Sequence, residues 1–169
     1  MKKVFLVFLV SVMMGSQIAR AEELKFAYVD INKIFDEYEK TKKFDQELQN
    51  EGKGKQEKRD ALVYEVRRLR DEQALLSEEK KKDAQAGIEA KLKELDEFDQ
   101  RAQQDLGERR NVIMKEIFTD IDDLIKRFGE RKGFDVIFNE RALLHKNQKH
   151  DQTNEVLKEL NEEYKKKKK

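Results

Sequence analysis

The chain has 169 residues, of which 43% are charged and 37% hydrophobic, and it contains no Trp, Pro or Cys. The absence of Cys excludes disulfides and thiolate metal sites, and 37 basic residues nearly balance 36 acidic ones, which is not the charge of a nucleic-acid-binding protein. A conventional globular core is undersupplied with apolar residues. Interspersed charges of both signs and the absence of proline instead favour long, solvent-exposed helices.

The first 21 residues show the three-part pattern of a secretory signal peptide. Met1-Lys2-Lys3 is basic, residues 4–14 are apolar, and Ala19-Arg20-Ala21 is an A-x-A cleavage site. The apolar run is shorter than the roughly 20 residues that span a membrane, so we expect cleavage rather than anchoring. Removal of Lys2, Lys3 and Arg20 changes the formal charge from +1 to −2, and residues 22–164 carry about −7.

A short strand opens the mature chain. Phe26-Ala27-Tyr28-Val29 is rich in aromatic and β-branched residues, and Asp30 is a suitable N-cap for a helix that begins near Ile31. Apolar residues then recur at helical spacing up to Tyr38.

Two long helices follow, and the sequence predicts that they form an antiparallel hairpin. Coiled-coil spacing predicts one helix over 41–79 and a second over 84–128. The polar segment 77–83 between them predicts a tip within 77–87. The alternative is a single unbroken helix that runs through this segment. A turn near residue 82 would place Leu69 opposite Leu95 and Phe26 level with Phe138. The polar segment 49–60, with Gly52 and Gly54, predicts a bendable stretch.

The C-terminal part predicts a second strand and a last helix. Phe134, Val136 and Phe138 alternate with polar residues, and residues 142–145 are a candidate third strand. Asp151-Gln-Thr153 can cap a helix whose apolar residues would cover the sheet. So small a sheet needs further burial, which oligomerisation would supply. The predicted contact residues between copies are Phe26, Tyr28, Phe134, Val136 and Phe138.

The expected fold is therefore α+β and mostly α: a long antiparallel helical hairpin, the arm, on a small β-sheet oligomerisation body. We expect residues 22–40 and 129–164 to form the body and 41–128 the arm, with 165–169 as a basic tail.

Catalytic, cofactor-binding and metal residues are not predicted. Gly52-Lys-Gly-Lys55 lacks the glycine spacing and hydroxyl of a phosphate-binding loop. His145 and His150 are interpreted as a strand and a loop residue rather than metal ligands.

The signal peptide, the strand 26–29 with Asp30, the charged hairpin, Phe134-Asp-Val-Ile-Phe-Asn139 and Asp151-Gln-Thr153 together resemble the OmpH/Skp family. That resemblance covers 22–164. It implies a periplasmic chaperone whose trimeric β-sheet body carries three helical arms, with unfolded outer-membrane proteins held between them. Two features depart from the family: the mature chain is not strongly basic, and it ends in the lysine run 165–169.

The resemblance implies ATP-independent holding of clients by many weak contacts. Val63, Leu75 and Phe98 are the candidate client contacts on the arms, with packing inside the hairpin as the alternative for each. The lysine run has two interpretations, contact with an anionic membrane surface or a simply solvated tail. A structural coiled-coil scaffold, or a surface-associated protein without clients, is the alternative function. The trimer rests on the resemblance, because such apolar stripes also serve dimers and tetramers.

Overall fold

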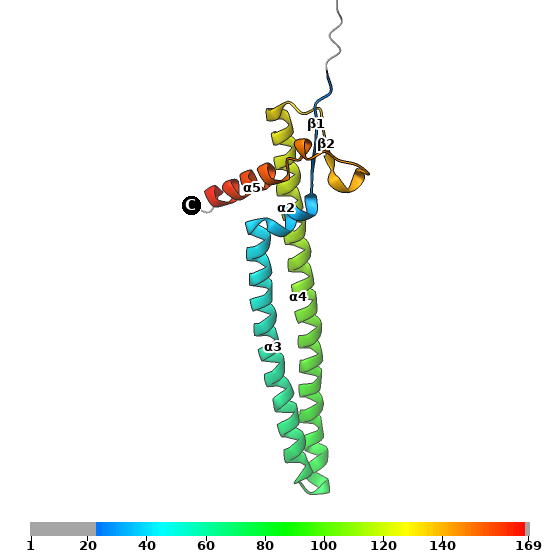
Figure 1. Ribbon diagram of the computed structural model, residues 1–169. Helices are drawn as coiled ribbons and strands as arrows, with labels where there is room; N and C mark the ends of the chain where they lie inside the picture. Colours follow the sequence, from blue (N-terminus) through cyan, green and yellow to red (C-terminus); the bar gives the residue numbers. More distant parts are fainter. Residues whose placement is uncertain (1–22, 168–169) are drawn as a thin grey trace, which may run out of the picture.

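The computed structural model describes residues 23–167 and shows a long two-helix arm hanging from a small body (Figure 1). The predicted signal peptide, 1–21, lies outside the described residues. The elements in chain order are β1 (Phe26–Val29), α2 (Ile31–Glu37), α3 (Glu39–Ala74), α4 (Glu78–Lys132), β2 (Val136–Asn139), the 3₁₀ turns η1 (Glu140–Ala142) and η2 (Gln148–His150), and α5 (Thr153–Lys167). The predicted class, mostly α with a small sheet, is confirmed. None of the helices in 23–167 combines the length and the apolar character needed to cross a membrane.

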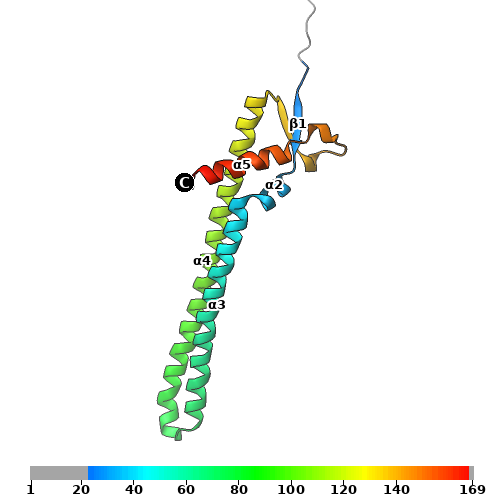
Figure 2. The ribbon, with the colours of Figure 1, turned by 60° about the vertical axis from the view of Figure 1, so that its left-hand side comes forward.

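The body begins with a strand and a capped helix, as the sequence predicts. The Asp30 side chain accepts hydrogen bonds from the backbone N–H groups of Asn32 and Lys33, which satisfies two donors at the start of α2. Tyr38 has extended backbone angles and separates α2 from α3. The chain therefore changes direction at Tyr38, where the arm starts (Figure 2).

The arm is a hairpin, but its tip lies earlier than predicted. Leu75, Leu76 and Ser77 make the turn, and α4 begins at Glu78, so most of the segment predicted as the tip is helical. Its Glu and Lys residues are good helix formers, and acidic residues suit the first turn of a helix. The predicted register is displaced accordingly: Arg59 pairs with Asp99, whereas a turn at 82 would have placed it beside residue 105.

The two strands lie side by side but run parallel, and this corrects the predicted pairing. Phe26 pairs with Val136, and Tyr28 pairs with Phe138. Gly133 explains the direction, because its left-handed conformation (φ 68°) ends α4 and turns the chain back along β1. The predicted third strand is wrong: residues 143–147 are irregular, between η1 and η2.

The core lies where α4 passes through the body. Apolar residues of β1, α2, α4 and α5 pack together there, and the fully buried ones include Val29, Ile34, Ile117, Ile121, Leu124, Phe128 and Val156. α4 has 55 residues and a length of about 80 Å, so one continuous helix belongs to both the core and the arm.

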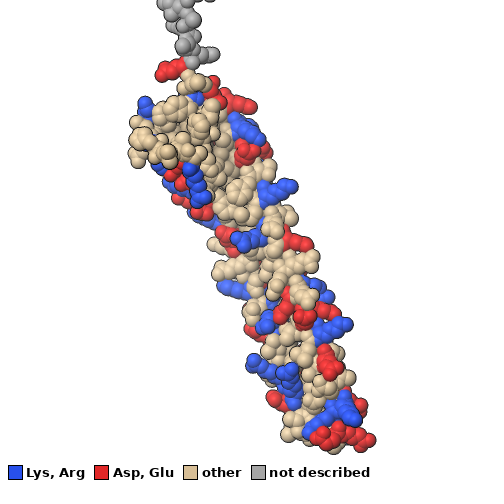
Figure 3. Space-filling model, turned by 90° about the vertical axis from the view of Figure 1, so that its right-hand side faces the viewer, with Lys and Arg blue, Asp and Glu red and all other residues tan. Residues whose placement is uncertain are grey.

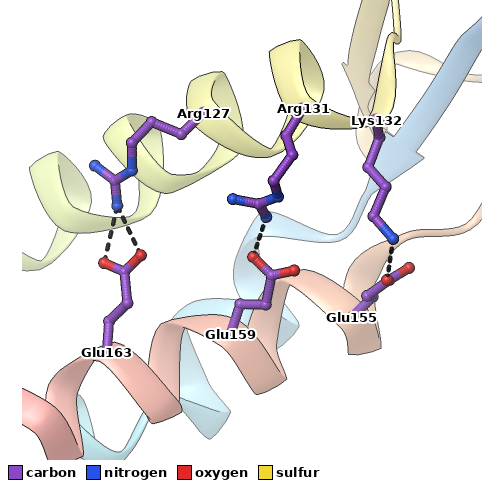
Figure 4. Close-up of polar contacts among 6 residues, drawn as sticks. All are labelled: Arg127, Arg131, Lys132, Glu155, Glu159 and Glu163. Atoms are coloured by element: carbon purple, nitrogen blue, oxygen red, sulfur yellow. Dashed lines mark hydrogen bonds and ion pairs between the residues drawn. The ribbon is translucent and has the colours of Figure 1, made fainter.

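The last helix, α5, packs against the root of the arm, which is the end of α3 and α4 that joins the body. Its buried face packs on α4, and its outer face forms three ion pairs with the end of α4: Arg127–Glu163, Arg131–Glu159 and Lys132–Glu155 (Figure 4). Asn161 accepts a hydrogen bond from the backbone N–H of Glu39 (2.8 Å), a donor at the start of α3 that has no partner within its own helix. α5 extends through Lys167, so the first part of the predicted tail is helical, and Lys165 pairs with Glu39 (2.7 Å).

Candidate functional site: the sheet face and the arm surface

One face of the two-stranded sheet is apolar and partly open to solvent. Side chains alternate along a strand, and the parallel register therefore places Phe26, Tyr28, Val136 and Phe138 on the same face. Phe26, Val136 and Phe138 remain 47%, 42% and 40% exposed. The opposite face packs inward, where the Ile137 side chain lies against Gly129 so closely that a Cβ there would be only 3.2 Å from its Cδ1.

The other two predicted contact residues are already covered within the chain. Tyr28 is 2% exposed, and the Lys146 amine lies 5.7 Å from the centre of its ring. Phe134 is half-buried, stacks on Phe128 at 6.2 Å and carries Lys25 over its ring. These two aromatic residues pack inside the monomer, and the role of all five in assembly stays a prediction.

A hollow of about 460 Å³ lies beside β1 and is lined by Phe26, Phe134 and Leu24 together with Lys149 and His150. The His150 ring stacks on Phe26 at 4.5 Å. His150 is one of the two histidines that were considered as metal ligands from the sequence, and in the structure it packs against an aromatic ring. Over residues 23–167 there is no group of three or more His, Cys, Asp or Glu side chains arranged to hold a metal ion.

The three predicted client contacts occupy different positions on the arm. Val63 and Phe98 are half-buried on facing helices, and Leu75 at the tip is 88% exposed. Phe44, near the start of α3, is 6% exposed and packs at the root of the arm. The role of the three as contacts stays a prediction.

The sequence reasoning missed three more exposed apolar residues on the arm helices. Tyr64 is 69%, Val112 64% and Phe118 44% exposed, and Phe118 stacks on Phe35 at 5.1 Å. Tyr64 and Val112 do not lie on the apolar stripes that form the hairpin seam. An apolar residue outside a stripe is expected to be exposed, and this was the signal in the sequence that could have identified both. In the space-filling view, acidic and basic side chains intersperse along the arm around uncharged areas (Figure 3).

A partly buried polar cluster ties α3 to α4 at the root of the arm. Lys40 pairs with Glu116 (2.6 Å) and Asp120 (2.7 Å), and the Tyr38 hydroxyl donates to Asp120 (3.4 Å). Burial, and then the Asp120 charge, raise the pKa of Tyr38 above its ordinary value. Burial alone would lower the pKa of Lys40, but its hydrogen bonds to Asp120 and Glu116 outweigh that effect and raise it. Both groups keep their protons at neutral pH.

Replacing Asp120 with asparagine is expected to destabilise the protein by about 1–3 kcal/mol, because Lys40 and Tyr38 both lose a charged partner in a site with little solvent. Asp122→Asn is the matched control: the same change on the same helix removes only an exposed pair with Lys126. Thermal unfolding followed by circular dichroism measures both variants. Equal midpoints for the two would contradict the assignment of the cluster.

The known proteins that this chain is similar to match it over both the arm and the body. The sequence profile of the family described as "Outer membrane protein (OmpH-like)" matches residues 25–160, from the start of β1 to within α5. The chain belongs to the OmpH family. A search of curated proteins finds no match.

A solved structure shares the OmpH-family fold. It is a protein from Caulobacter crescentus, described provisionally as an OmpH-like outer membrane chaperone, with a TM-score of 0.70 and 15% sequence identity. The match covers 83% of this chain and 85% of the other. At this identity the likeness shows the shared fold, which confirms the arm-and-body architecture.

Proposed function

We propose that this OmpH-family protein is an ATP-independent holding chaperone of the periplasm, which binds unfolded outer-membrane proteins and prevents their aggregation. The observation that carries the proposal is an arm that projects from the core and keeps apolar residues open to solvent: Leu75 at the tip, and Tyr64 and Val112 along its sides. Family membership and the description of the Caulobacter protein support the same function.

The arm suits weak, repeated contact with an unfolded chain. Its exposed apolar side chains are separated by charged ones, so it offers several small contact points rather than one deep site. Several arms acting on one client multiply such contacts, and avidity then replaces a strong single site. Ion pairs between α3 and α4, such as Lys55–Asp105, Lys91–Glu65 and Glu51–Arg109, satisfy charged side chains on the surface of the arm and add modestly to the hairpin's stability.

The proposed assembly is a homotrimer formed through the sheet face. A sheet of two strands with an open apolar face is too small to be stable alone, and copies packed around an axis would cover Phe26, Val136 and Phe138 together. Three arms would then surround a common space in which a client could be held.

Dilution of a denatured outer-membrane β-barrel protein into buffer tests the function. The mature chain, 22–169, at equimolar oligomer is expected to suppress the light scattering of the aggregating client, without ATP. An oligomer that leaves the scattering unchanged would instead favour the structural scaffold or the surface-associated protein.

We propose separately that the lysine run 165–169 is a solvated tail and not a contact with anionic membranes. Each free Lys near a charged surface contributes about 1 kcal/mol, but Lys165 already pairs with Glu39. We therefore expect deletion of 165–169 to leave binding to anionic phospholipid vesicles unchanged in a co-sedimentation assay. A loss of vesicle binding would show that the run is a membrane contact.

A further inference from the structure

The root of the arm carries an exposed pair of stacked aromatic rings. Phe35 of α2 and Phe118 of α4 lie with their ring centres 5.1 Å apart and their planes 16° from parallel. Phe118 is 44% exposed, whereas Ile117 and Ile121 of the same helix are fully buried in the core. Phe35 covers one face of the Phe118 ring, and the exposed part of that ring is open to solvent.

Phe118 faces the same side of the molecule as the open face of the sheet. Gly129 of α4 faces the sheet, because a Cβ there would lie 3.2 Å from the Cδ1 atom of Ile137. Phe118 lies eleven residues before Gly129, which is about three helical turns, so both residues are on one face of α4. Figures 1 and 2 both show α2, which carries Phe35, between β1 and the start of the arm. The aromatic pair therefore points the same way as the apolar sheet face, at a level closer to the tip.

In the proposed trimer, this side of each arm faces the space between the arms. Copies that meet through Phe26, Val136 and Phe138 would turn the open sheet faces towards the common axis. The aromatic pairs of the three copies would then line the end of the space that is next to the body. An inference about what covers them accordingly rests on the proposed function.

Met114 extends the apolar surface by one turn towards the tip. It is half-buried and lies four residues before Phe118, so the two side chains are neighbours on the surface of α4. A thioether is flexible and polarizable, and it makes favourable contacts with aromatic rings. Exposed Lys115 and Asp122 lie three residues before and four residues after Phe118 and border this surface with charges. We call Phe35, Met114 and Phe118 the root patch.

We infer that the root patch binds aromatic side chains of the unfolded outer-membrane protein. A third ring can continue the offset stack on the open face of Phe118, and such a ring pair gains roughly two- to tenfold in affinity beyond the burial of its area. Outer-membrane barrels carry girdles of aromatic residues at both membrane interfaces, so each client supplies rings at many points along its chain. The root patch would thus select a side-chain chemistry, whereas Leu75 and Val112 suit any apolar segment.

Two synthetic peptides of about 20 residues, the length of two barrel strands, test the inference. They are identical except that one carries aromatic residues at alternate positions where the other carries leucine, whose free energy of burial is similar. By fluorescence anisotropy, the mature oligomer, 22–169, is expected to bind the aromatic peptide about three- to tenfold more tightly. Phe118→Leu should bring this ratio close to one without weakening the binding of the leucine peptide. Phe118→Tyr, which restores a ring, should keep the ratio.

Tyr64→Leu is the matched comparison, because it removes another exposed ring of the arm, 69% exposed on α3. The ratio of the two affinities should be the same in Y64L as in the wild type. Equal loss of the ratio in Y64L and F118L would mean that any aromatic residue of the arm gives the preference, and it would contradict the root patch as its source.

A benzophenone side chain in place of Phe118 identifies what covers the root patch. Irradiation of the oligomer with the aromatic peptide is expected to link position 118 to the peptide. A link to a second copy alone would place the patch between copies and overturn the inference. A wild type that holds a denatured β-barrel protein but binds both peptides equally would overturn the root patch and leave the proposed function standing. Failure to hold that protein would overturn the proposed function and the inference together.

Discussion

Replacing Phe138 with aspartate is expected to dissociate the proposed trimer into monomers. Phe138 pairs with Tyr28 in the sheet and is 40% exposed on the apolar face, beside Phe26 and Val136. A carboxylate buried in the proposed interface between copies would lose its water, at a cost of several kcal/mol per copy. The dissociation constant should therefore rise by at least about a thousandfold, and sedimentation velocity of 22–169 should show monomers at micromolar concentration.

Phe118→Asp is the control for this prediction. It makes the same change at a similarly exposed phenylalanine, 44% exposed, that lies on α4 and away from the sheet. We expect F118D to remain oligomeric, and circular dichroism should show that both variants keep their helices. An F138D chain that sediments as the wild type does would mean that the sheet face is not the contact between copies.

The second large effect is expected on the arm. Replacing Tyr64, Leu75 and Val112 with serine should weaken the binding of an unfolded outer-membrane protein by roughly 10–100-fold, because each change removes apolar surface that a client would cover. Stability should change little, since all three side chains are largely exposed. Fluorescence titration of a labelled client gives the affinity, and light scattering gives the suppression of aggregation.

The matched control replaces three exposed polar residues of the same helices, Asn50, Gln85 and Asn111, with serine. The control should bind clients as the wild type does. If both triple variants bind equally well, the exposed apolar residues of the arm are not the client contacts.

Local signals predicted the elements better than their pairing. Asp30 as a helix cap and the alternation from Phe134 to Phe138 depend only on neighbours in sequence, and both identified their elements. The tip and register depended on whether Ser77–Asp83 is a loop or a helix start. An acidic first turn after Ser77 favours the helix, but the apolar Leu75 and Leu76 resemble seam residues rather than a turn. The parallel strand direction depended on one conformation, the left-handed Gly133.

The candidate site could be predicted only in part, for a related reason. Strand alternation places Phe26, Val136 and Phe138 on one face, but the cover over Tyr28 comes from the irregular segment after β2, which has no periodic pattern.

Site-specific photo-crosslinking tests most directly the central claim that the arms hold unfolded clients. A benzophenone side chain replaces Val112 on the arm or, in a second variant, the exposed Lys158 on the body helix α5, and the intact oligomer is irradiated with a denatured β-barrel protein freshly diluted into buffer. The account predicts a crosslinked product from position 112 and little from position 158. Crosslinks from position 158 alone, or from neither position while the client stays soluble, would contradict it.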